Sequence, residues 1–374
     1  MIRILEIGMT KNVGGIQTFL MNFNRAIKSD EVKIDYVCIY PDQNTLYFKQ
    51  ELDELGAEII NIPDYHKHFI RSYKAIKKLV EERKYDVVHY NMNSACYMIP
   101  LMAAKAGGAK VIISHSHNAS SDKGIVKSIV HWINKHFIPL YANVFFACSD
   151  KAGKWFFSKK IRDSKNYYFI PNAIDFEKYR FNFEIRNRIR KELGYSEDNF
   201  VIGLVGRFAK QKNHEYLISL FQKIVEKNKK ARLLLVGHGP LKEKIENKIK
   251  RLGIEDKVTV LSFRKDIPDL LQAMDCFVMP SIYEGLPVAG VEAQASGLPC
   301  WFSENITREL EISNKAHYFE LKNDDKLINE IKNLDSENDR AFSFYDGKEI
   351  FDNKNLANFI INIFSEIIYA NNKK

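Results

Sequence analysis

The sequence lacks long hydrophobic runs: no segment has the roughly 20 consecutive apolar residues that a helix needs to span a bilayer. Its five cysteines are scattered, and no two have the Cys-x-x-Cys spacing of zinc or redox sites. This pattern argues against a disulfide framework and a structural zinc site, and it favours a reducing compartment. The first residues, MIRILEIG, lack the length and the cleavage site of a signal peptide. We therefore expect a cytoplasmic protein, either soluble or bound to a membrane surface.

The overall composition is typical of a folded protein, because 45% of the residues are hydrophobic and 28% are charged. The 374 residues are about twice the usual length of one domain, which predicts two domains. The net charge of +9 is concentrated in residues 1–180, which carry 26 Lys and Arg against 18 Asp and Glu. This basic half indicates an anionic partner, namely a nucleic acid, a phosphorylated substrate or an anionic membrane. A solubilising surface bias is the alternative.

Short apolar segments alternate with amphipathic ones, which predicts βαβ units and parallel sheets. The strands expected in the first half are 2–7, 34–39, 59–62, 86–89, 111–114, 144–147 and 167–170. Those expected in the second half are 200–205, 231–236, 258–261, 276–279, 299–302 and 316–320. The alternation is interrupted at 171–183 and then resumes, so we expect two similar α/β domains. The segment 355–370 has apolar residues at helical spacing, which predicts a helix with one apolar face.

Two cations follow the expected strand 200–205 in the segment IGLVGRFAKQKNH. The strand leads into Gly206 and Arg207, and Lys212 comes five residues later. Ligands bind where the strands of parallel sheets end. An arginine fork together with the point charge of a lysine suits a diphosphate. A solvated loop with incidental charges is the alternative.

The segment MPSIYEGLPVAGVEAQASGLP is more specific. The turn at Glu284 leads into a helix, and the backbone N–H groups of 285–288 at its start can bind an anion. Glu292 follows Glu284 by about two helical turns, so the two carboxylates can reach one elongated ligand that has both phosphates and sugars. The helix is apolar almost all round, which indicates that Glu292 is partly buried and partnered rather than solvated.

Two glycine-containing turns also follow expected strands. Gly14 and Gly15 precede an amphipathic segment, and Gly237 lies in VGHGPL after the strand 231–236. Glycine lets a backbone approach a ligand closely. Neither turn has the G-x-G-x-x-G order or the lysine-serine pair of a P-loop. At Gly237, a plain turn explains the sequence as well as a ligand site does.

The segment HSHN follows the expected strand 111–114. His115 and His117 could ligate a metal ion, but no further His, Cys, Asp or Glu lies at a recognisable metal-site spacing. A contact to a sugar or a phosphate by these histidines and Asn118 fits better, and an incidental turn is the alternative. The chain also lacks Asp-x-Asp, the usual carboxylate pair that holds a divalent metal on a nucleotide diphosphate. Positive charge for such a ligand would come from Arg207, Lys212 and backbone dipoles.

In chain order, the segments GGIQTF, HSHN, IPNAID, VGRFAKQKN, VGHGPL and EGLPVAGVE resemble the retaining GT-B glycosyltransferases of family 4, the group 1 type of bacterial surface-polysaccharide synthesis. The resemblance covers most of the chain. It implies an α/β fold in which two Rossmann-like domains face each other across a cleft. The acceptor domain would be 1–178, the nucleotide-sugar domain 190–354, and the helix 355–374 would pack back on the first. Ala173 and Ser262 stand where the family usually has glycine.

The resemblance also implies roles for individual residues. Arg207 and Lys212 would neutralise the diphosphate of the donor. Glu284 would contact the hydroxyls of the donor sugar, and Glu292 those of the ribose. His117, rather than His115, would lie near the transferred sugar. The catalytic set would be His117, Glu284, Arg207 and Lys212, and the other donor-binding residues Gly14, Gly15, Gly206, Gly237, Arg264, Gly285, Leu286, Pro287, Val288 and Glu292.

The implied reaction moves a hexose from a nucleotide diphosphate, most often UDP, to an acceptor hydroxyl with anomeric retention, without a cofactor or a metal ion. No well-placed carboxylate nucleophile is evident in the first half, so the resemblance favours front-face attack, in which the departing phosphate helps take the acceptor's proton. A nucleotide-sugar epimerase or phosphorylase of the same architecture is one alternative, and a soluble acceptor is another. The chain lacks any zinc, RRM-like or helix-turn-helix signature, which disfavours a nucleic-acid partner.

The segment 124–140, GIVKSIVHWINKHFIPL, indicates where the acceptor is met. Read as one helix, it places Lys127 and Lys135 beside Trp132 and aliphatic residues, with Lys123 just before it, as interfacial helices do. The basic first half adds attraction to anionic lipid. We expect peripheral binding to the cytoplasmic leaflet, where a lipid-linked glycan is extended for capsule, exopolysaccharide or O-antigen. A helix packed in the core with solvated lysines is the alternative.

Overall fold

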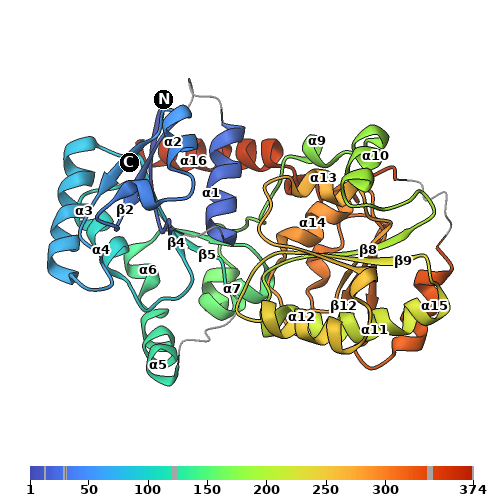
Figure 1. Cartoon of the computed structure of the whole chain (residues 1–374). Coiled ribbons are helices and arrows are strands. Elements are labelled where there is room, and N and C mark those ends of the chain that lie inside the picture. Colours follow the sequence, from blue (N-terminus) through green and yellow to red (C-terminus); the bar gives the residue numbers. More distant parts are fainter. Residues whose placement is uncertain (12–13, 28–29, 31, 119–123, 335–339, 373–374) are drawn as a thin grey trace. The chain divides into compact units, whose positions relative to one another are not determined.

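The computed structural model describes the chain except for residues 12–13, 28–29, 31, 119–123, 335–339 and 373–374. It has two compact units (Figure 1): unit 1 is Met1–Ala173 with Ile350–Lys374, and unit 2 is Ile174–Glu349. Unit 1 ends at Ala173 rather than at the expected residue 178, because the short helix α9 (Phe176–Tyr179) packs on α14 (Val288–Ala295) of unit 2.

Unit 1 contains a seven-stranded parallel sheet with the order β3-β2-β1-β4-β5-β6-β7. Its strands are β1 Ile2–Ile7, β2 Val32–Cys38, β3 Glu58–Asn61, β4 Val87–Met92, β5 Val111–Ser116, β6 Val144–Ala147 and β7 Tyr167–Phe169. Its helices are α1 Gly15–Ala26, α2 Lys49–Glu54, α3 Phe69–Arg83, α4 Ile99–Ala106, α5 Ile125–Asn134, α6 Ile138–Tyr141, α7 Asp150–Phe156, α8 Lys159–Arg162 and α16 Asn353–Asn372.

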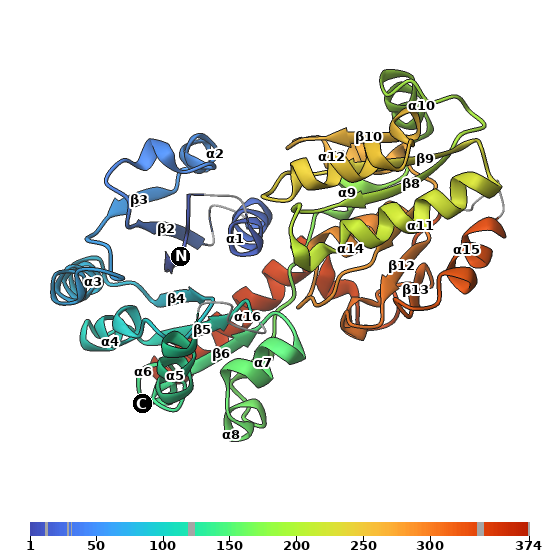
Figure 2. The same cartoon turned by 60° about the horizontal axis from the view of Figure 1, so that its bottom comes forward.

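Alternation along the strands of unit 1 gives the sheet two apolar faces, which different helices cover. Ile4 and Phe146 face one core cluster together with α1 and α16, while Leu5 and Phe145 face another together with α3 and α4. Figure 2 shows α1 and α16 on one side of the sheet and α3 and α4 on the other. The apolar stripe of α16 is buried in unit 1 through Leu356, Ala357, Ile360, Ile363 and Phe364.

Unit 2 contains a six-stranded parallel sheet with the order β10-β9-β8-β11-β12-β13. Its strands are β8 Phe200–Val205, β9 Ala231–Val236, β10 Val258–Leu261, β11 Cys276–Met279, β12 Cys300–Ser303 and β13 Ala316–Phe319. Its other helices are α10 Phe183–Glu192, α11 His214–Lys227, α12 Lys242–Arg251, α13 Ile267–Gln272 and α15 Asp324–Lys332. The expectation of two Rossmann-like α/β units is confirmed.

In both sheets the strand order reverses at one point, between β1 and β4 in unit 1 and between β8 and β11 in unit 2. The connections on the two sides of such a point leave in opposite directions and open a crevice at the carboxyl ends of the strands. The predicted motifs follow β1, β8 and β11, so the topology places them beside these crevices.

The expectation of one helix over 124–140 is wrong, because the structure has α5 and α6 separated by a break. Pro139 lies in the first turn of α6. In one continuous helix its ring would clash with the carbonyl of Lys135, the C-cap residue of α5. The strand β5 also extends to Ser116, beyond the expected end at residue 114. His115 is therefore part of a buried strand rather than of the turn that follows it.

Candidate functional site

The loops after β8 and β11 of unit 2 meet, because these strands are neighbours where the sheet order reverses. Their backbones are joined by a hydrogen bond of 2.8 Å from Ile282 N–H to Gln211 O. At this junction Lys212 Nζ lies 2.8 Å from Glu284 Oε1. The structure thus brings together two residues that the sequence predicts to bind one ligand.

The Lys212–Glu284 pair is largely shielded from water, since the two side chains are 15% and 9% exposed. Their attraction is therefore less screened than that of a surface pair. Gly206 makes room for the lysine, because a Cβ at this position would lie 3.1 Å from Lys212 Cε. Arg207 is exposed and makes no ion pair within the described part of the chain.

The glycine at position 237 is explained by packing between loops. Gly237 has φ +151°, and a Cβ there would lie 2.1 Å from Gly206 O. Its N–H donates to Leu261 O at 2.9 Å, and the Gly206 N–H donates to Val236 O at the same distance. Gly237 therefore lets the loops after β8 and β9 approach each other, and this close approach alone accounts for the residue.

The turn before α14 presents its backbone rather than its side chains. Leu286 is 6% exposed, and Pro287 is also buried and precedes the first helical residue, Val288. No side chain caps the N-terminus of α14. N–H groups at the start of a helix carry partial positive charge and bind anions. The sequence GLPV, residues 285–288, thus forms a backbone surface for a negatively charged group directly after Glu284.

Glu292, about one turn into α14, accepts a hydrogen bond of 2.6 Å from Tyr179 Oη of α9. Burial raises the pKa of Glu292, and the hydrogen bond from Tyr179 and the charge of Lys212 act in the opposite direction. Tyr179 is held in turn by Gln272 Nε2, which donates to its backbone carbonyl at 3.1 Å. Tyr179 could not be predicted, because no signal in the segment IDFEKYR points to it.

Arg264 is engaged by two carboxylates. Its Nε and Nη2 donate to the two oxygens of Asp266 at 2.7 and 2.6 Å, and Nη2 also lies 3.0 Å from Glu192 Oε1. The guanidinium is thus held by its own loop and by α10. Phe263, the preceding residue, is 48% exposed and leaves an aromatic surface at the end of β10.

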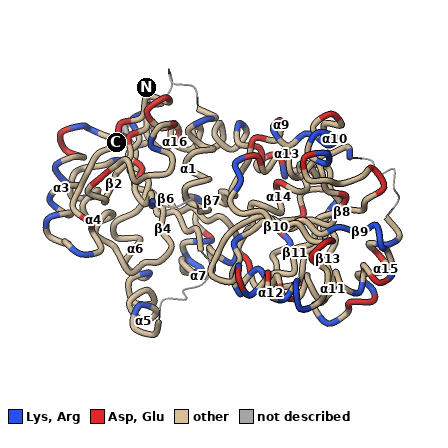
Figure 3. Tube along the Cα trace, viewed as in Figure 1, with Lys and Arg blue, Asp and Glu red and all other residues tan. Residues whose placement is uncertain are grey.

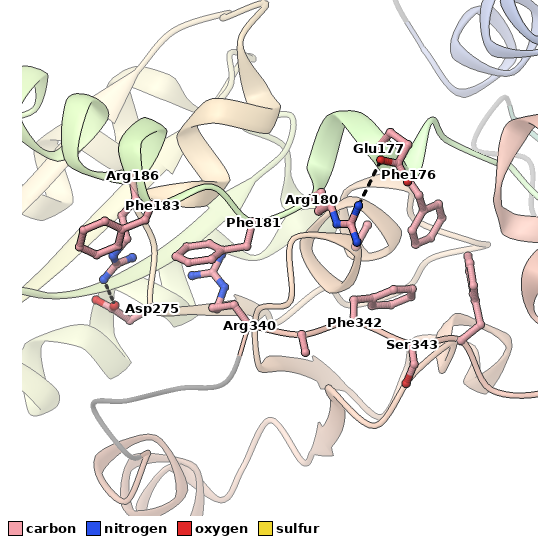
Figure 4. A pocket seen from close by; sticks show the side chains of 13 residues that line it. Phe176, Glu177, Arg180, Phe181, Phe183, Arg186, Asp275, Arg340, Phe342 and Ser343 are labelled. Atoms are coloured by element: carbon pink, nitrogen blue, oxygen red, sulfur yellow. Dashed lines mark hydrogen bonds and ion pairs between the residues drawn. The ribbon is translucent and has the colours of Figure 1, made fainter.

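A separate pocket of about 790 Å³ lies in unit 2 beside α9 and α10. Figure 4 shows its aromatic and arginine side chains, among them Phe181 and Arg340. Arg340 Nε and Nη1 donate to Ser296 O and Met274 O at 2.9 Å each, and its guanidinium lies over the Phe181 ring. None of the residues that the sequence predicts for the site lines this pocket.

In unit 1, neighbouring strands place polar side chains on one face of the sheet. Glu6 of β1 pairs in register with His89 of β4, and Asn91 of β4 pairs with His115 of β5. Because side chains alternate along a strand, His89 and Asn91 point to the same side. His117 follows β5 directly. We call Glu6, His89, Asn91, His115 and His117 the Glu6 network.

The members of the Glu6 network are linked in two arms. In one arm Glu6 Oε1 lies 2.9 Å from His89 Nδ1, and His89 Nε2 lies 3.0 Å from His115 Nδ1. In the other arm Asn91 Nδ2 donates to Glu6 Oε2 at 2.8 Å, and Asn91 Oδ1 lies 2.8 Å from His117 Nε2. The two arms end side by side, because the rings of His115 and His117 have centroids 3.9 Å apart.

The two terminal histidines are neutral, because burial lowers the pKa of His115 far below its usual range and that of His117 to about 3. Phe19 of α1 packs against both rings, with centroids 4.9 and 5.3 Å away. Gly14 and Gly15, at the start of α1, are exposed. Both histidines were predicted from the sequence, whereas Glu6, His89 and Asn91 were not. A polar residue within an otherwise apolar strand, as in ILEI and VVHYNM, is a usable signal for such residues.

The helix α5 attaches to unit 1 through polar residues and exposes its apolar ones. His131 is buried and accepts from Ala95 N–H at 3.0 Å, and Asn134 Nδ2 donates to Ala95 O at 2.9 Å. By contrast, Trp132 is 63% exposed and Ile125 81% exposed. This arrangement is the reverse of the usual orientation of a surface helix.

The remaining exposed apolar residues of this region are Val126, Ile129, Val130, Ile133, Phe137 and Leu140. Lys127, also on α5, is exposed, and Lys135 at its end is half-buried. Figure 3 shows where Lys and Arg, in blue, lie along the trace at α5. Lys123 lies outside the described residues. The apolar and aromatic residues named here therefore face away from the core, so the alternative of a core-packed helix does not hold.

Two further properties bear on the kind of site. Within the described residues, no group of three or more His, Cys, Asp and Glu side chains is arranged to hold a metal ion. In the same part of the chain, no helix combines the length and the apolar character needed to cross a membrane.

Comparison with known families divides the chain as the structure does. Residues 13–178 match the family described as Glycosyltransferase Family 4, and residues 185–343 match Glycosyl transferases group 1. The putative glycosyltransferase EpsF of Bacillus subtilis is 31% identical, over 83% of this chain and 81% of its own. The UDP-Gal:α-D-GlcNAc-diphosphoundecaprenol α-1,3-galactosyltransferase of Escherichia coli is 27% identical, over 88% of this chain and 87% of its own.

Solved structures with the same fold include HepE of Anabaena in complex with UDP-glucose. That structure has a TM-score of 0.75 and 18% sequence identity, over all of both chains. A glycosyltransferase from Rickettsia africae has a TM-score of 0.79 and 14% identity, over 98% of each chain. The two Rossmann-like units and the order of the motifs are those expected for the family that these matches indicate. The chain therefore belongs to the GT-B glycosyltransferases of family 4.

Proposed function

We propose that this enzyme transfers a hexose from a UDP-sugar to a hydroxyl of a lipid-linked glycan, with retention of the anomeric configuration and without a metal ion. The observation that carries the proposal is the Lys212–Glu284 pair at the β8/β11 crevice, beside the uncapped start of α14. A cation, free backbone N–H groups and a carboxylate suit a ligand that joins phosphates to a sugar.

The donor would be held along unit 2. The ammonium of Lys212 has three N–H donors, so it can keep Glu284 and still donate to a phosphate. Arg207 adds an exposed positive charge on the same loop. Glu292 would accept from the ribose hydroxyls while Tyr179 fixes one of its oxygens. Because the sequence has no Asp-x-Asp, Lys212, Arg207 and the amides of α14 would balance the charge of the departing diphosphate.

Retention is proposed to occur by front-face attack. Both oxygens of Glu6, the buried carboxylate in the Glu6 network, already have partners in His89 and Asn91. A carboxylate that is engaged on both oxygens is a poor nucleophile for a double displacement. The proposal therefore assigns the acceptor's proton to the departing phosphate, and it assigns to His117 a contact with the transferred sugar.

The enzyme would bind its acceptor at an anionic membrane surface on the cytoplasmic side. The exposed apolar residues of α5, with Lys127 among them, suit insertion at the boundary between headgroups and acyl chains. The name of the Escherichia coli relative specifies a diphosphoundecaprenol-linked acceptor, and another relative is a Vi polysaccharide biosynthesis protein of Salmonella typhi. These names support a lipid-linked glycan for this chain.

The proposal is tested by incubating the enzyme with UDP-galactose, UDP-glucose and UDP-GlcNAc, each with and without diphosphoundecaprenol-linked GlcNAc. We expect one donor to give a lengthened glycolipid by mass spectrometry, with retained configuration by NMR and with equal yield in EDTA. Conversion of a donor without acceptor would indicate an epimerase. Loss of transfer in EDTA, restored by Mg²⁺ or Mn²⁺, would contradict metal independence.

A further inference from the structure

The amide of Asn91 can adopt only one orientation in the Glu6 network. Its Nδ2 donates to Glu6 Oε2 at 2.8 Å and lies 3.3 Å from Ile7 O, and both of these partners are acceptors. Turning the amide over would place its oxygen against two oxygens and lose both hydrogen bonds. The Oδ1 of Asn91 therefore faces His117.

This orientation determines which nitrogen of His117 carries the proton. Asn91 Oδ1 is an acceptor and lies 2.8 Å from His117 Nε2, so Nε2 must be protonated. Because burial holds the pKa of His117 at about 3, the ring is neutral and its Nδ1 has no proton. Nδ1 is buried and has no hydrogen-bond partner among the described residues. A buried acceptor without a donor is costly unless a ligand supplies one.

The surroundings of Asn91 and His117 keep this geometry rigid. Gly8, with φ +118°, lies so close to Asn91 that a Cβ there would be 2.3 Å from the Asn91 carbonyl oxygen. Phe19 and His115 pack against the ring of His117. Glu6 is held in place by His89 as well as by Asn91. Rotation of the imidazole would thus require several packed groups to move.

We infer that Asn91, oriented by Glu6, is a positioning residue that fixes His117 with a bare Nδ1, so that His117 accepts a hydrogen bond from a hydroxyl of the bound sugar. This inference rests on the proposed function. The inference also predicts specificity. A ligand that places a hydroxyl at the buried Nδ1 should bind more tightly than one that places an acceptor or an apolar group there. Glu6 and Asn91 act through His117 and need not touch the substrate.

The tautomer is measured directly by ¹⁵N NMR of the intact enzyme labelled at histidine, with His117→Gln to assign the signals. We expect His117 to show a protonated Nε2 and an unprotonated Nδ1 from pH 6 to pH 8. A protonated Nδ1, or a doubly protonated ring, in that range would overturn the inference. The measurement needs no substrate, so it stands whether or not the enzyme transfers a sugar.

Two variants test whether sugar transfer depends on the fixed tautomer of His117. Asn91→Leu removes the acceptor for Nε2–H, and we expect a mixture of tautomers and a loss of about tenfold or more in kcat, with KM for the donor changed less. Asn91→Asp keeps an acceptor at Oδ1 and shares a proton with Glu6, since two adjacent carboxylates do not both ionise. We expect this variant to keep the wild-type tautomer and most of the activity.

Asp35→Asn is the matched control, because Asp35 is a buried carboxylate of unit 1 that binds Tyr85 and lies outside the Glu6 network. We expect it to lower stability without changing the His117 signals. Equal activity loss in Asn91→Leu and Asn91→Asp, or an unchanged kcat in Asn91→Leu, would show that sugar transfer does not depend on the tautomer of His117, and would overturn the inference. Normal tautomer behaviour in an enzyme that transfers no sugar would instead reject the proposed function.

Discussion

Lys212 and Glu284 form an ion pair of 2.8 Å across the junction of two loops that follow neighbouring strands. The pair accounts for the presence of a carboxylate beside a proposed phosphate site. Glu284 Oε1 lies 2.8 Å from the ammonium of Lys212 and so holds it in place at the start of the proposed site. In the proposed function, the pair lies where the phosphate and sugar parts of a nucleotide sugar meet.

Replacing Lys212 by methionine tests this pair. Lys212→Met removes a charge-assisted contact worth roughly 1.5–3 kcal/mol and leaves Glu284 unpaired near the diphosphate, so kcat/KM should fall about 10- to 150-fold. Lys210→Met is the matched control, because Lys210 is an exposed lysine of the same loop, and it should change kcat/KM by no more than about twofold. Steady-state transfer rates and UDP binding by calorimetry measure both variants. Equal effects of the two changes would reject the assignment of Lys212.

The pH dependence of UDP binding should report Glu292. Burial raises the pKa of this carboxyl, and the hydrogen bond from Tyr179 lowers it. Protonation removes an acceptor for the ribose hydroxyls, so affinity should decrease as the pH falls, and it should do so at a higher pH than for an ordinary glutamate. Tyr179→Phe removes the opposing hydrogen bond, so the decrease should move to higher pH. A pH profile for Tyr179→Phe that overlies the wild-type profile would contradict this role.

Membrane binding by α5 is tested by co-sedimentation with vesicles that contain anionic lipid. Replacing Lys127, Trp132 and Lys135 together by serine should abolish binding at low salt, since each basic residue near the surface contributes about 1 kcal/mol and the indole adds apolar burial. Lys227→Ser with Lys229→Ser, two exposed lysines of unit 2, is the control for net charge. If the wild type does not sediment with vesicles at low salt, a soluble acceptor becomes the better assignment.

The packing of α16 on unit 1 predicts a large effect of one residue. Phe364 is fully buried and stacks with Phe146 at 6.5 Å between ring centroids. Phe364→Ala should lower the free energy of unfolding by about 3–5 kcal/mol, measured by chemical denaturation. Phe359→Ala, on the same helix but 39% exposed, should have a much smaller effect. Similar losses for the two variants would show that α16 is not part of the core of unit 1.

The strands could be predicted closely, because short apolar runs between polar segments leave few alternatives. The strands β1, β6, β8, β9, β10 and β11 begin and end at the residues expected from the sequence. The extension of β5 through His115 could not be predicted, since a histidine followed by serine is typical of a turn. The buried network on Glu6 and His89 provides the physical reason, because it supplies hydrogen bonds that keep polar residues within a strand.

The charged part of the site was predictable from local sequence, whereas its supporting contacts were not. Lys212, Glu284 and Glu292 stand in motifs whose residue types indicate their chemistry. Tyr179 is 113 residues away from Glu292, and its role depends on how α9 packs on α14. Asn91 likewise contacts His117, which follows a different strand. Such contacts follow from tertiary packing, which does not produce a motif of fixed spacing in the sequence.

The position of α16 has a consequence for biosynthesis on the ribosome. Unit 2 is contiguous in the chain, whereas the core of unit 1 is completed by residues that follow unit 2. Until α16 has been synthesised, the nascent chain carries α1 without the helix that covers its apolar residues, while the whole of unit 2 has already been made. A truncated mRNA or a proteolytic cut that removes α16 therefore yields a polypeptide in which unit 2 is complete and unit 1 exposes apolar residues. Chaperones and proteases recognise products of this kind.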